Sequence, residues 1–236
     1  MTSDCDQHHY VALPHLEVNR EAKQTILLIH GATGDGTTWD LVTPHLPGYH
    51  LLVPDLPGHG IARQHPFSVV HASNLLSQLI LDRAHNRVAY VVGFSLGAHV
   101  AMHLRIEYAI PRSWTRWAMD GINIPRPDLS MCTLDYNRQV FGHSDSTEQW
   151  PRAWPARTLV IAAGKGGLVP SNDRPQDALK LATIGQHLNS ATRAVTHPDM
   201  RHPWIWQAPE LFAETVRLWF EESTVPDGFV SLARDH

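Results

Sequence analysis

The clearest chemical signal in this chain is a serine between two glycines, in the run G-F-S-L-G at residues 93–97. The run ends an apolar segment and opens a helical pattern, so Ser95 is expected in a sharp strand-to-helix turn. Such a turn strains the serine backbone, and only small flanking residues tolerate its crowding. The N–H of Leu96 would then face the oxyanion that forms when Ser95 attacks a carbonyl group. The pattern predicts a serine nucleophile.

A serine hydroxyl is a poor nucleophile until a neighbouring imidazole takes its proton. His202 is the preferred base, because it follows the last predicted strand and precedes a helix that begins at Pro209. Proline suits the first turn of a helix, where its missing N–H costs nothing. His197 is the competitor, but it lies directly at the end of the strand, with less loop to carry it to Ser95.

Short apolar runs alternate with helical patterns along the chain, which is typical of a parallel sheet covered on both faces. We expect strands at residues 25–29, 50–53, 88–93, 114–119, 158–162 and 191–196. We expect helices at residues 68–83, 96–108, 176–188 and 209–220. The length of 236 residues suits one domain, so the prediction is a single α/β domain over residues 1–236.

The serine run, the His30-Gly31 turn and His202 together resemble the α/β-hydrolase superfamily, over roughly residues 24–222. The resemblance implies the α/β-hydrolase fold, a mostly parallel sheet flanked by helices. It also implies that the backbone N–H of Ala32 is the second oxyanion donor. The run V-P-D-L-P-G-H-G at residues 53–60 resembles a turn of the same family. Such turns serve structure, so Asp55 is not expected to be catalytic.

The catalytic acid departs from the family pattern. In most of the family it follows the seventh strand, and alignment on Pro170 places Gly166 where an aspartate is expected. We favour Asp120, at the end of the preceding strand, where haloalkane dehalogenases can carry their acid in a similar run. The second alternative is Asp173, reaching back from further along the same loop. The third is that no acid operates and the site is weakened or repurposed.

Residues 121–156 interrupt the alternation and are expected to form a short lid over a pocket. Several tryptophans lie near the motifs or in this segment, which predicts an aromatic, apolar substrate pocket. The residues chosen as its lining are Trp39, Trp150, Trp154 and Trp204.

Composition excludes other classes of protein. A net charge of -4 offers no basic surface for nucleic acid, and no apolar run is long enough to cross a bilayer. The two cysteines and an N-terminus unlike a signal peptide predict a cytoplasmic protein. The 17 histidines lack the spacing of metal ligands, so neither a metal nor a cofactor is expected. The expected partner is a small-molecule substrate, and the oligomeric state stays open.

These residues favour a serine hydrolase that cleaves a carboxylic ester, lactone or thioester of a small apolar substrate through an acyl-enzyme. One alternative is a tailoring enzyme, such as a cyclase, lyase or C–C bond hydrolase, that uses the same site without net ester hydrolysis. The other is a ligand-binding protein with a disabled triad.

Overall fold

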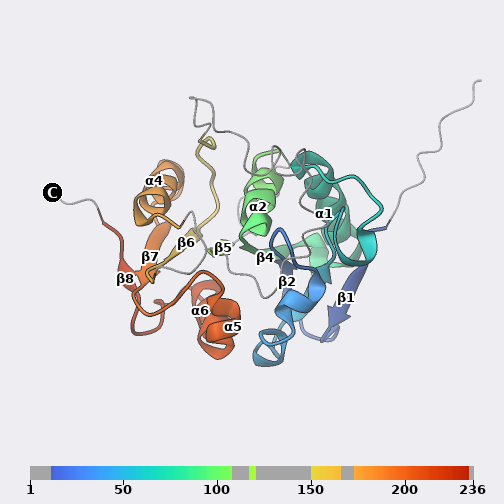
Figure 1. Cartoon of the computed structure of the whole chain (residues 1–236), viewed down its shortest axis with the longest axis horizontal. Coiled ribbons are helices and arrows are strands. Elements are labelled where there is room, and N and C mark those ends of the chain that lie inside the picture. Colours follow the sequence, from blue (N-terminus) through green and yellow to red (C-terminus); the bar gives the residue numbers. More distant parts are fainter. Residues whose placement is uncertain (1–11, 108–116, 121–149, 166–172, 234–236) are drawn as a thin grey trace, which may run out of the picture.

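One eight-stranded sheet forms the centre of the computed structural model (Figure 1). The structure describes residues 12–107, 117–120, 150–165 and 173–233, and describes only the backbone of residues 105–107 and 117–120. The strands lie in the order β1-β3-β2-β4-β5-β6-β7-β8. They are β1 (His15–Val18), β2 (Thr25–Ile29), β3 (His50–Pro54), β4 (Ala89–Phe94), β5 (Trp117–Asp120), β6 (Thr158–Ala163), β7 (Arg193–His197) and β8 (Val230–Ser231). Strands β2 to β7 run parallel, and β1 and β8 pair antiparallel at the two edges.

Helices cover both faces of this sheet (Figure 1). One face carries α1 (Val69–Arg83), α2 (Leu96–Glu107) and α4 (Pro175–Gln186), and the other carries α5 (Trp204–Gln207) and α6 (Pro209–Phe220). The sequence marks where helices begin. The Ser68 hydroxyl accepts a hydrogen bond from the His71 N–H and caps α1, while α4 and α6 each begin with a proline.

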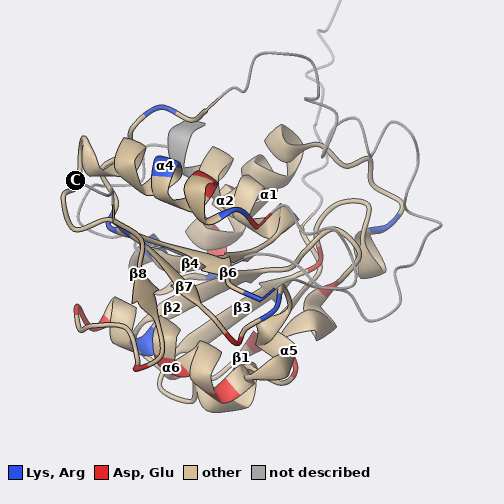
Figure 2. Ribbon diagram, turned by 60° about the vertical axis from the view of Figure 1, so that its left-hand side comes forward, with Lys and Arg blue, Asp and Glu red and all other residues tan. Residues whose placement is uncertain are grey.

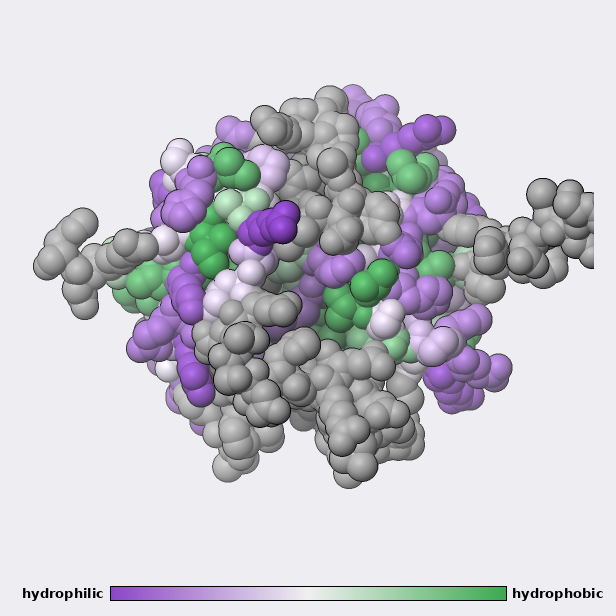
Figure 3. Space-filling view, turned by 90° about the horizontal axis from the view of Figure 1, so that it is seen from above, coloured by the Kyte–Doolittle hydropathy of each residue, from purple (hydrophilic) through white to green (hydrophobic). Residues whose placement is uncertain are grey.

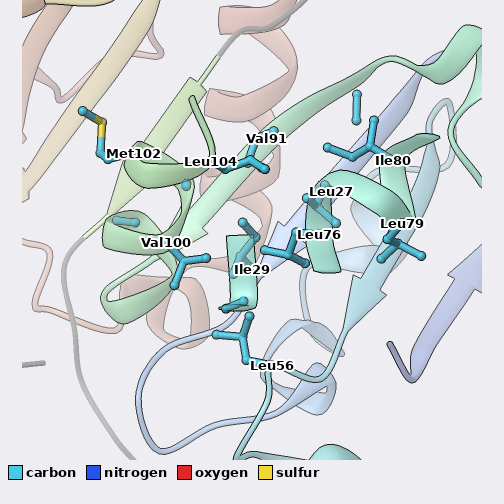
Figure 4. Close-up of a cluster of buried hydrophobic side chains, with 14 of the residues drawn as sticks. Leu27, Ile29, Leu56, Leu76, Leu79, Ile80, Val91, Val100, Met102 and Leu104 are labelled. Atoms are coloured by element: carbon cyan, nitrogen blue, oxygen red, sulfur yellow. The ribbon is translucent and has the colours of Figure 1, made fainter. Parts of the chain in front are cut away.

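Strand β2 shows how the two layers share the core. All five of its residues are buried, and alternate side chains point to opposite faces. Leu27 and Ile29 belong to the cluster with α1 and α2, which Figure 4 shows in close-up. Ile26 and Leu28 belong to the cluster with α6. A strand that is buried on both faces must be apolar throughout, as this one is.

The α/β fold class is confirmed, and the expected elements are present with shifted ends. Helix α6 has the expected bounds, whereas the strands expected at 114–119 and 191–196 are observed at Trp117–Asp120 and Arg193–His197. Strands β1 and β8 were not expected. Most of the expected lid, residues 121–149, and residues 114–116 lie outside the described residues.

The described surface is polar and mixed in charge. Lysine and arginine residues are interspersed with aspartate and glutamate residues over both helical layers (Figure 2). Seen from above, hydrophilic residues predominate and hydrophobic ones form separate patches (Figure 3). Among the described residues, no helix has the length and apolar character needed to cross a membrane. The same residues include no cluster of three or more His, Cys, Asp or Glu side chains able to hold a metal ion.

Candidate active site

Three of the sequence-predicted residues follow parallel strands at the same edge of the sheet. Ser95 follows β4, Asp173 follows β6 and precedes α4, and His202 follows β7 and precedes α5. The carboxyl ends of parallel strands meet at one edge, which is where open α/β sheets place their sites. The topology therefore brings a serine, a histidine and a carboxylate to the same end of the strands from positions far apart in the sequence.

Ser95 occupies the strained turn that its flanking glycines predict. Its φ angle is 54°, in the left-handed region that non-glycine residues rarely adopt. A Cβ atom on Gly93 would lie 2.5 Å from the Gly97 carbonyl oxygen, and one on Gly97 would lie 2.2 Å from the Ile29 carbonyl oxygen. Gly93 must therefore be glycine for the turn to close on itself, and Gly97 must be glycine for it to pack against β2. The Ser95 hydroxyl oxygen is buried and has no hydrogen-bond partner among the described residues.

The His202 ring is fixed by a carboxylate. Its Nδ1–H donates to the Oδ2 atom of Asp173 over 2.5 Å, and the two side chains are 6% and 11% exposed. The opposite ring nitrogen, Nε2, is buried and has no partner within the described part of the chain. The ring of Phe94, the residue before Ser95, lies 6.0 Å from the His202 ring. With Nδ1 engaged by Asp173, Nε2 is the ring nitrogen left available to accept a proton.

Burial sets the protonation of this pair. It raises the pKa of the Asp173 carboxyl from 3.8 to about 7, against the opposing effect of a hydrogen bond with the Ala163 backbone. It lowers the pKa of His202 from 6.5 to about 3. Because burial penalises both charged forms, His202 stays neutral near pH 7 and can act as a base. The two groups share a short hydrogen bond, so their protonation is coupled.

The end of β2 brings the other expected oxyanion donor toward Ser95. A Cβ atom on Gly31 would lie 3.0 Å from the Phe94 ring and 3.3 Å from the Ser95 Cβ atom, so the chain passes the serine turn closely here. Ala32 is the next residue and is 7% exposed. On the other side, Leu96 is the first residue of α2, and the first N–H groups of a helix have no intrahelical partner. Leu96 therefore adjoins Ser95 in the chain, and Gly31, the residue before Ala32, adjoins it in space.

Two side chains after His202 hold its loop. The Gln207 amide donates to the Asp199 carbonyl over 3.0 Å and accepts from the Arg201 N–H over 3.1 Å. The Trp206 Nε1–H donates to the Thr38 carbonyl over 3.0 Å, which ties α5 to the segment after β2. The sequence did not predict these roles of Gln207 and Trp206, because no local pattern indicates a side-chain hydrogen bond to a distant backbone group.

The structure bears differently on the two candidate acids. Asp173, the second alternative, makes the hydrogen bond to His202. Asp120 ends β5 with its backbone in register with Phe94, and its side chain lies outside the described residues. Its catalytic role stays a prediction. His197, the competing base, is 9% exposed, and its Nδ1 accepts from the Asp199 N–H within its own loop. Asp55 accepts backbone hydrogen bonds from Gly36 and Ile61, in keeping with a structural role.

The expected tryptophan pocket needs correction. Trp39 and Trp204 are 0% exposed and pack in the core around Phe212, with no face open to a ligand. Trp154 is 2% exposed, and its N–H donates to Thr158 at the start of β6. This is the amino-terminal end of the parallel strands, opposite the end where Ser95 lies. Trp150 lies under the Lys180 ammonium group of α4. Large apolar rings near a motif in sequence can serve the core equally well, as Trp39, Trp154 and Trp204 do. Trp150 is only partly buried, and its place in a pocket stays a prediction.

Comparison with known proteins agrees with the geometry. A model of the alpha/beta hydrolase family matches residues 26–220. The chain belongs to this family.

Relatives with different named activities share parts of the sequence. An AB hydrolase superfamily protein of Gibberella zeae is 31% identical over 240 residues, covering 87% of this chain and 83% of the relative. Lipase LipV of Mycobacterium tuberculosis is 37% identical over 79 residues, covering 34% of this chain and 30% of the lipase. A 2-succinyl-6-hydroxy-2,4-cyclohexadiene-1-carboxylate synthase of Pectobacterium atrosepticum is 32% identical over 83 residues, covering 35% of this chain and 32% of the synthase.

Solved structures share the fold at low sequence identity. BpoC of Mycobacterium tuberculosis superimposes with a TM-score of 0.64 at 19% identity, covering 92% of this chain and 98% of BpoC. MenH of S. aureus superimposes with a TM-score of 0.63 at 16% identity, covering 90% of this chain and 98% of MenH.

Proposed function

We propose that this chain is a serine hydrolase that cleaves a carboxylic ester, lactone or thioester of a small apolar substrate through an acyl-enzyme on Ser95. The observation that carries the proposal is the His202–Asp173 hydrogen bond, which leaves the buried Nε2 atom of His202 without a described partner. A histidine held in this way has the tautomer that can accept a proton from a serine hydroxyl. The strained turn at Ser95 supports the same reading.

In this proposal, Ser95 Oγ attacks the substrate carbonyl carbon while its proton passes to His202 Nε2. The N–H groups of Ala32 and Leu96 bind the oxyanion of the tetrahedral intermediate. His202 then gives its proton to the leaving alcohol or thiol, and the acyl group stays on Ser95. A water molecule attacks the acyl carbon, gives a proton to His202, and releases the acid. That proton returns to Ser95 Oγ, which restores the enzyme.

Asp173 stabilises the imidazolium ion that forms in each step and keeps the ring oriented. Asp120 is the alternative acid, since it ends the strand beside β4. The partly exposed ring of Trp206 supports an apolar substrate, because it packs against Phe94, whose ring lies 6.0 Å from the His202 ring.

The test is hydrolysis of p-nitrophenyl esters and acyl-thioesters of increasing chain length, followed by identification of the products. We expect wild-type turnover and a loss of about 10⁶-fold in kcat for Ser95→Ala, the size found where a nucleophilic serine is removed. His71→Asn, an exposed substitution on α1, is the matched control and should leave turnover unchanged. Wild-type turnover that survives Ser95→Ala would refute the acyl-enzyme route.

A second candidate is chemistry without net ester hydrolysis, favoured by the similarity to the Pectobacterium atrosepticum synthase. There His202 would serve as the base and the oxyanion donors would stabilise an enolate. A wild-type protein that turns over no ester or thioester, but eliminates or cleaves a C–C bond in a β-keto or 2-hydroxy acid substrate, would favour this candidate. A folded protein that binds such compounds without turnover would favour a ligand-binding role.

A further inference from the structure

His59 lies buried in the turn after β3 and is 2% exposed. The glycines on either side of it, Gly58 and Gly60, have φ angles of 78° and 48°, a backbone that other residues adopt only with strain. The ring packs 5.1 Å from the His30 ring and 5.7 Å from the Phe67 ring. The P-G-H-G sequence thus turns an imidazole inward, toward the segment that follows β2.

Both ring nitrogens of His59 face backbone carbonyl oxygens. Nε2 lies 2.8 Å from the Ala32 oxygen, and Nδ1 lies 2.9 Å from the Pro57 oxygen. A carbonyl oxygen only accepts hydrogen bonds, so the ring must supply the hydrogen. A hydrogen on Nε2 holds the Ala32 carbonyl, and a hydrogen on Nδ1 holds the Pro57 carbonyl in the turn that carries His59. A neutral ring supplies one of these hydrogens and an imidazolium ring supplies both.

His30 holds the neighbouring peptide group. Burial and the nearby His59 lower the pKa of His30 from 6.5 to about 3, so its ring is neutral. Its Nδ1–H donates to the Gly31 carbonyl over 2.8 Å, and its Nε2 accepts from the Leu56 N–H over 2.9 Å. The Gly31 carbonyl belongs to the same planar peptide as the Ala32 N–H, and the two groups point in opposite directions. Fixing this carbonyl therefore fixes the direction of the N–H.

We propose that His59 is a positioning residue for the oxyanion hole, acting through its Nε2–H bond to the Ala32 carbonyl. With His30 holding the peptide before Ala32 and His59 holding the peptide after it, neither can rotate. The Ala32 N–H then points at the oxyanion before substrate arrives. A donor fixed in advance costs no reorganisation during the reaction, which is where such donors gain their effect. This inference rests on the acyl-enzyme function proposed above.

Two substitutions separate positioning from mere support of the fold. A glutamine amide reaches about as far as Nε2, so His59→Gln can keep the bond to Ala32. An asparagine amide reaches about as far as Nδ1, so His59→Asn can keep the bond to Pro57 and loses Ala32. We expect His59→Asn to lower kcat for a p-nitrophenyl ester by about 10- to 100-fold with KM unchanged, short of the 10²–10³-fold cost of deleting a donor. His59→Gln should stay within about threefold of wild type, since it keeps the hydrogen bond.

Affinity for a trifluoromethyl ketone, which forms a tetrahedral adduct with a reactive serine, should fall with kcat in His59→Asn and recover in His59→Gln. The exposed pair His71→Asn and His71→Gln on α1 serves as the matched control. Nitrogen-15 NMR of wild type should show a protonated Nε2 on His59, assigned by its loss in His59→Gln.

The outcomes are distinct. An active wild type with equal kcat for His59→Gln and His59→Asn, or an unprotonated Nε2, overturns the role of His59 alone. A wild type that neither turns over esters nor binds the ketone refutes the proposed function, and the positioning role falls with it.

Discussion

Replacing Asp173 with asparagine should make the protein more stable and almost inactive. The side chain is 11% exposed, and its pKa is raised from 3.8 to about 7 by burial. A raised carboxyl pKa means that the stabilising contribution of the protonated group is present below pH 3.8 and is lost as the pH rises to about 7. Above that pH, wild type carries the full cost of a buried carboxylate, whereas asparagine does not titrate.

The size of the effect follows from the same values. A rise from 3.8 to about 7 corresponds to at most about 4 kcal/mol, at about 1.4 kcal/mol for each pH unit. Asparagine also loses part of the 2.5 Å bond to His202, so a net gain of about 1–3 kcal/mol at pH 8 is expected. The gain should shrink toward pH 4. Catalysis should suffer, because an asparagine N–H pointing at Nδ1 forces the wrong tautomer of His202, at a cost of about 10⁴-fold in kcat.

Urea unfolding at pH 4.5 and pH 8, with ester turnover at pH 8, measures both effects. Asp82→Asn, at an exposed position on α1, is the control and should change neither. The reasoning fails if Asp173→Asn is less stable than wild type at pH 8, which would make the carboxylate a net stabilising partner of His202. It also fails if kcat falls by less than tenfold.

Three further results are expected. Turnover should fall about tenfold per pH unit below the pKa of Asp173, about 7. A protonated Asp173 donates to Nδ1, which leaves the hydrogen of His202 on Nε2, so that this nitrogen cannot accept a proton from Ser95. A flat profile from pH 5 to 8 would contradict this. The free energy of unfolding should be about 1 kcal/mol higher for Ser95→Gly than for Ser95→Ala, because glycine relieves the strain of a φ angle of 54°. Equal urea midpoints for the two variants would argue against strain. Gly97→Ala should lower the free energy of unfolding by about 2–4 kcal/mol, because its Cβ would lie 2.2 Å from a carbonyl oxygen of β2; Gly48→Ala, with open space around it, should be nearly neutral.

Elements with a strong local signal could be predicted from the sequence. The run at residues 93–97 predicts a strand, a turn and a helix, and the structure has β4, Ser95 and α2 in that order. Helix α6 is strongly amphipathic and starts at a proline, which defines both its face and its beginning. Strand β1 is short, partly exposed and lacks an apolar run, and β8 has two exposed residues, so neither has a pattern to detect.

The carboxylate partner of His202 could not be fixed from the sequence, because it depends on how a loop folds. Alignment on Pro170 assumes a constant spacing and points to Gly166. The structure instead brings Asp173 to His202, which is 29 residues away along the chain. The predicted pocket was wrong for Trp39, Trp154 and Trp204 for a related reason. Proximity to a motif in sequence does not reveal at which end of the strands a ring lies, and Trp154 lies at the amino-terminal end, away from Ser95.

The central claim is that Ser95 is activated by the His202–Asp173 pair. Intact mass after incubation with a fluorophosphonate tests it most directly, because this probe needs a reactive serine and little substrate recognition. We expect one adduct on wild type, none on Ser95→Ala, much slower labelling of Asp173→Asn, and near-normal labelling of Asp120→Asn. Fast labelling of Asp173→Asn with slow labelling of Asp120→Asn would identify Asp120, at the end of β5, as the catalytic acid. No adduct on folded wild type would contradict the account.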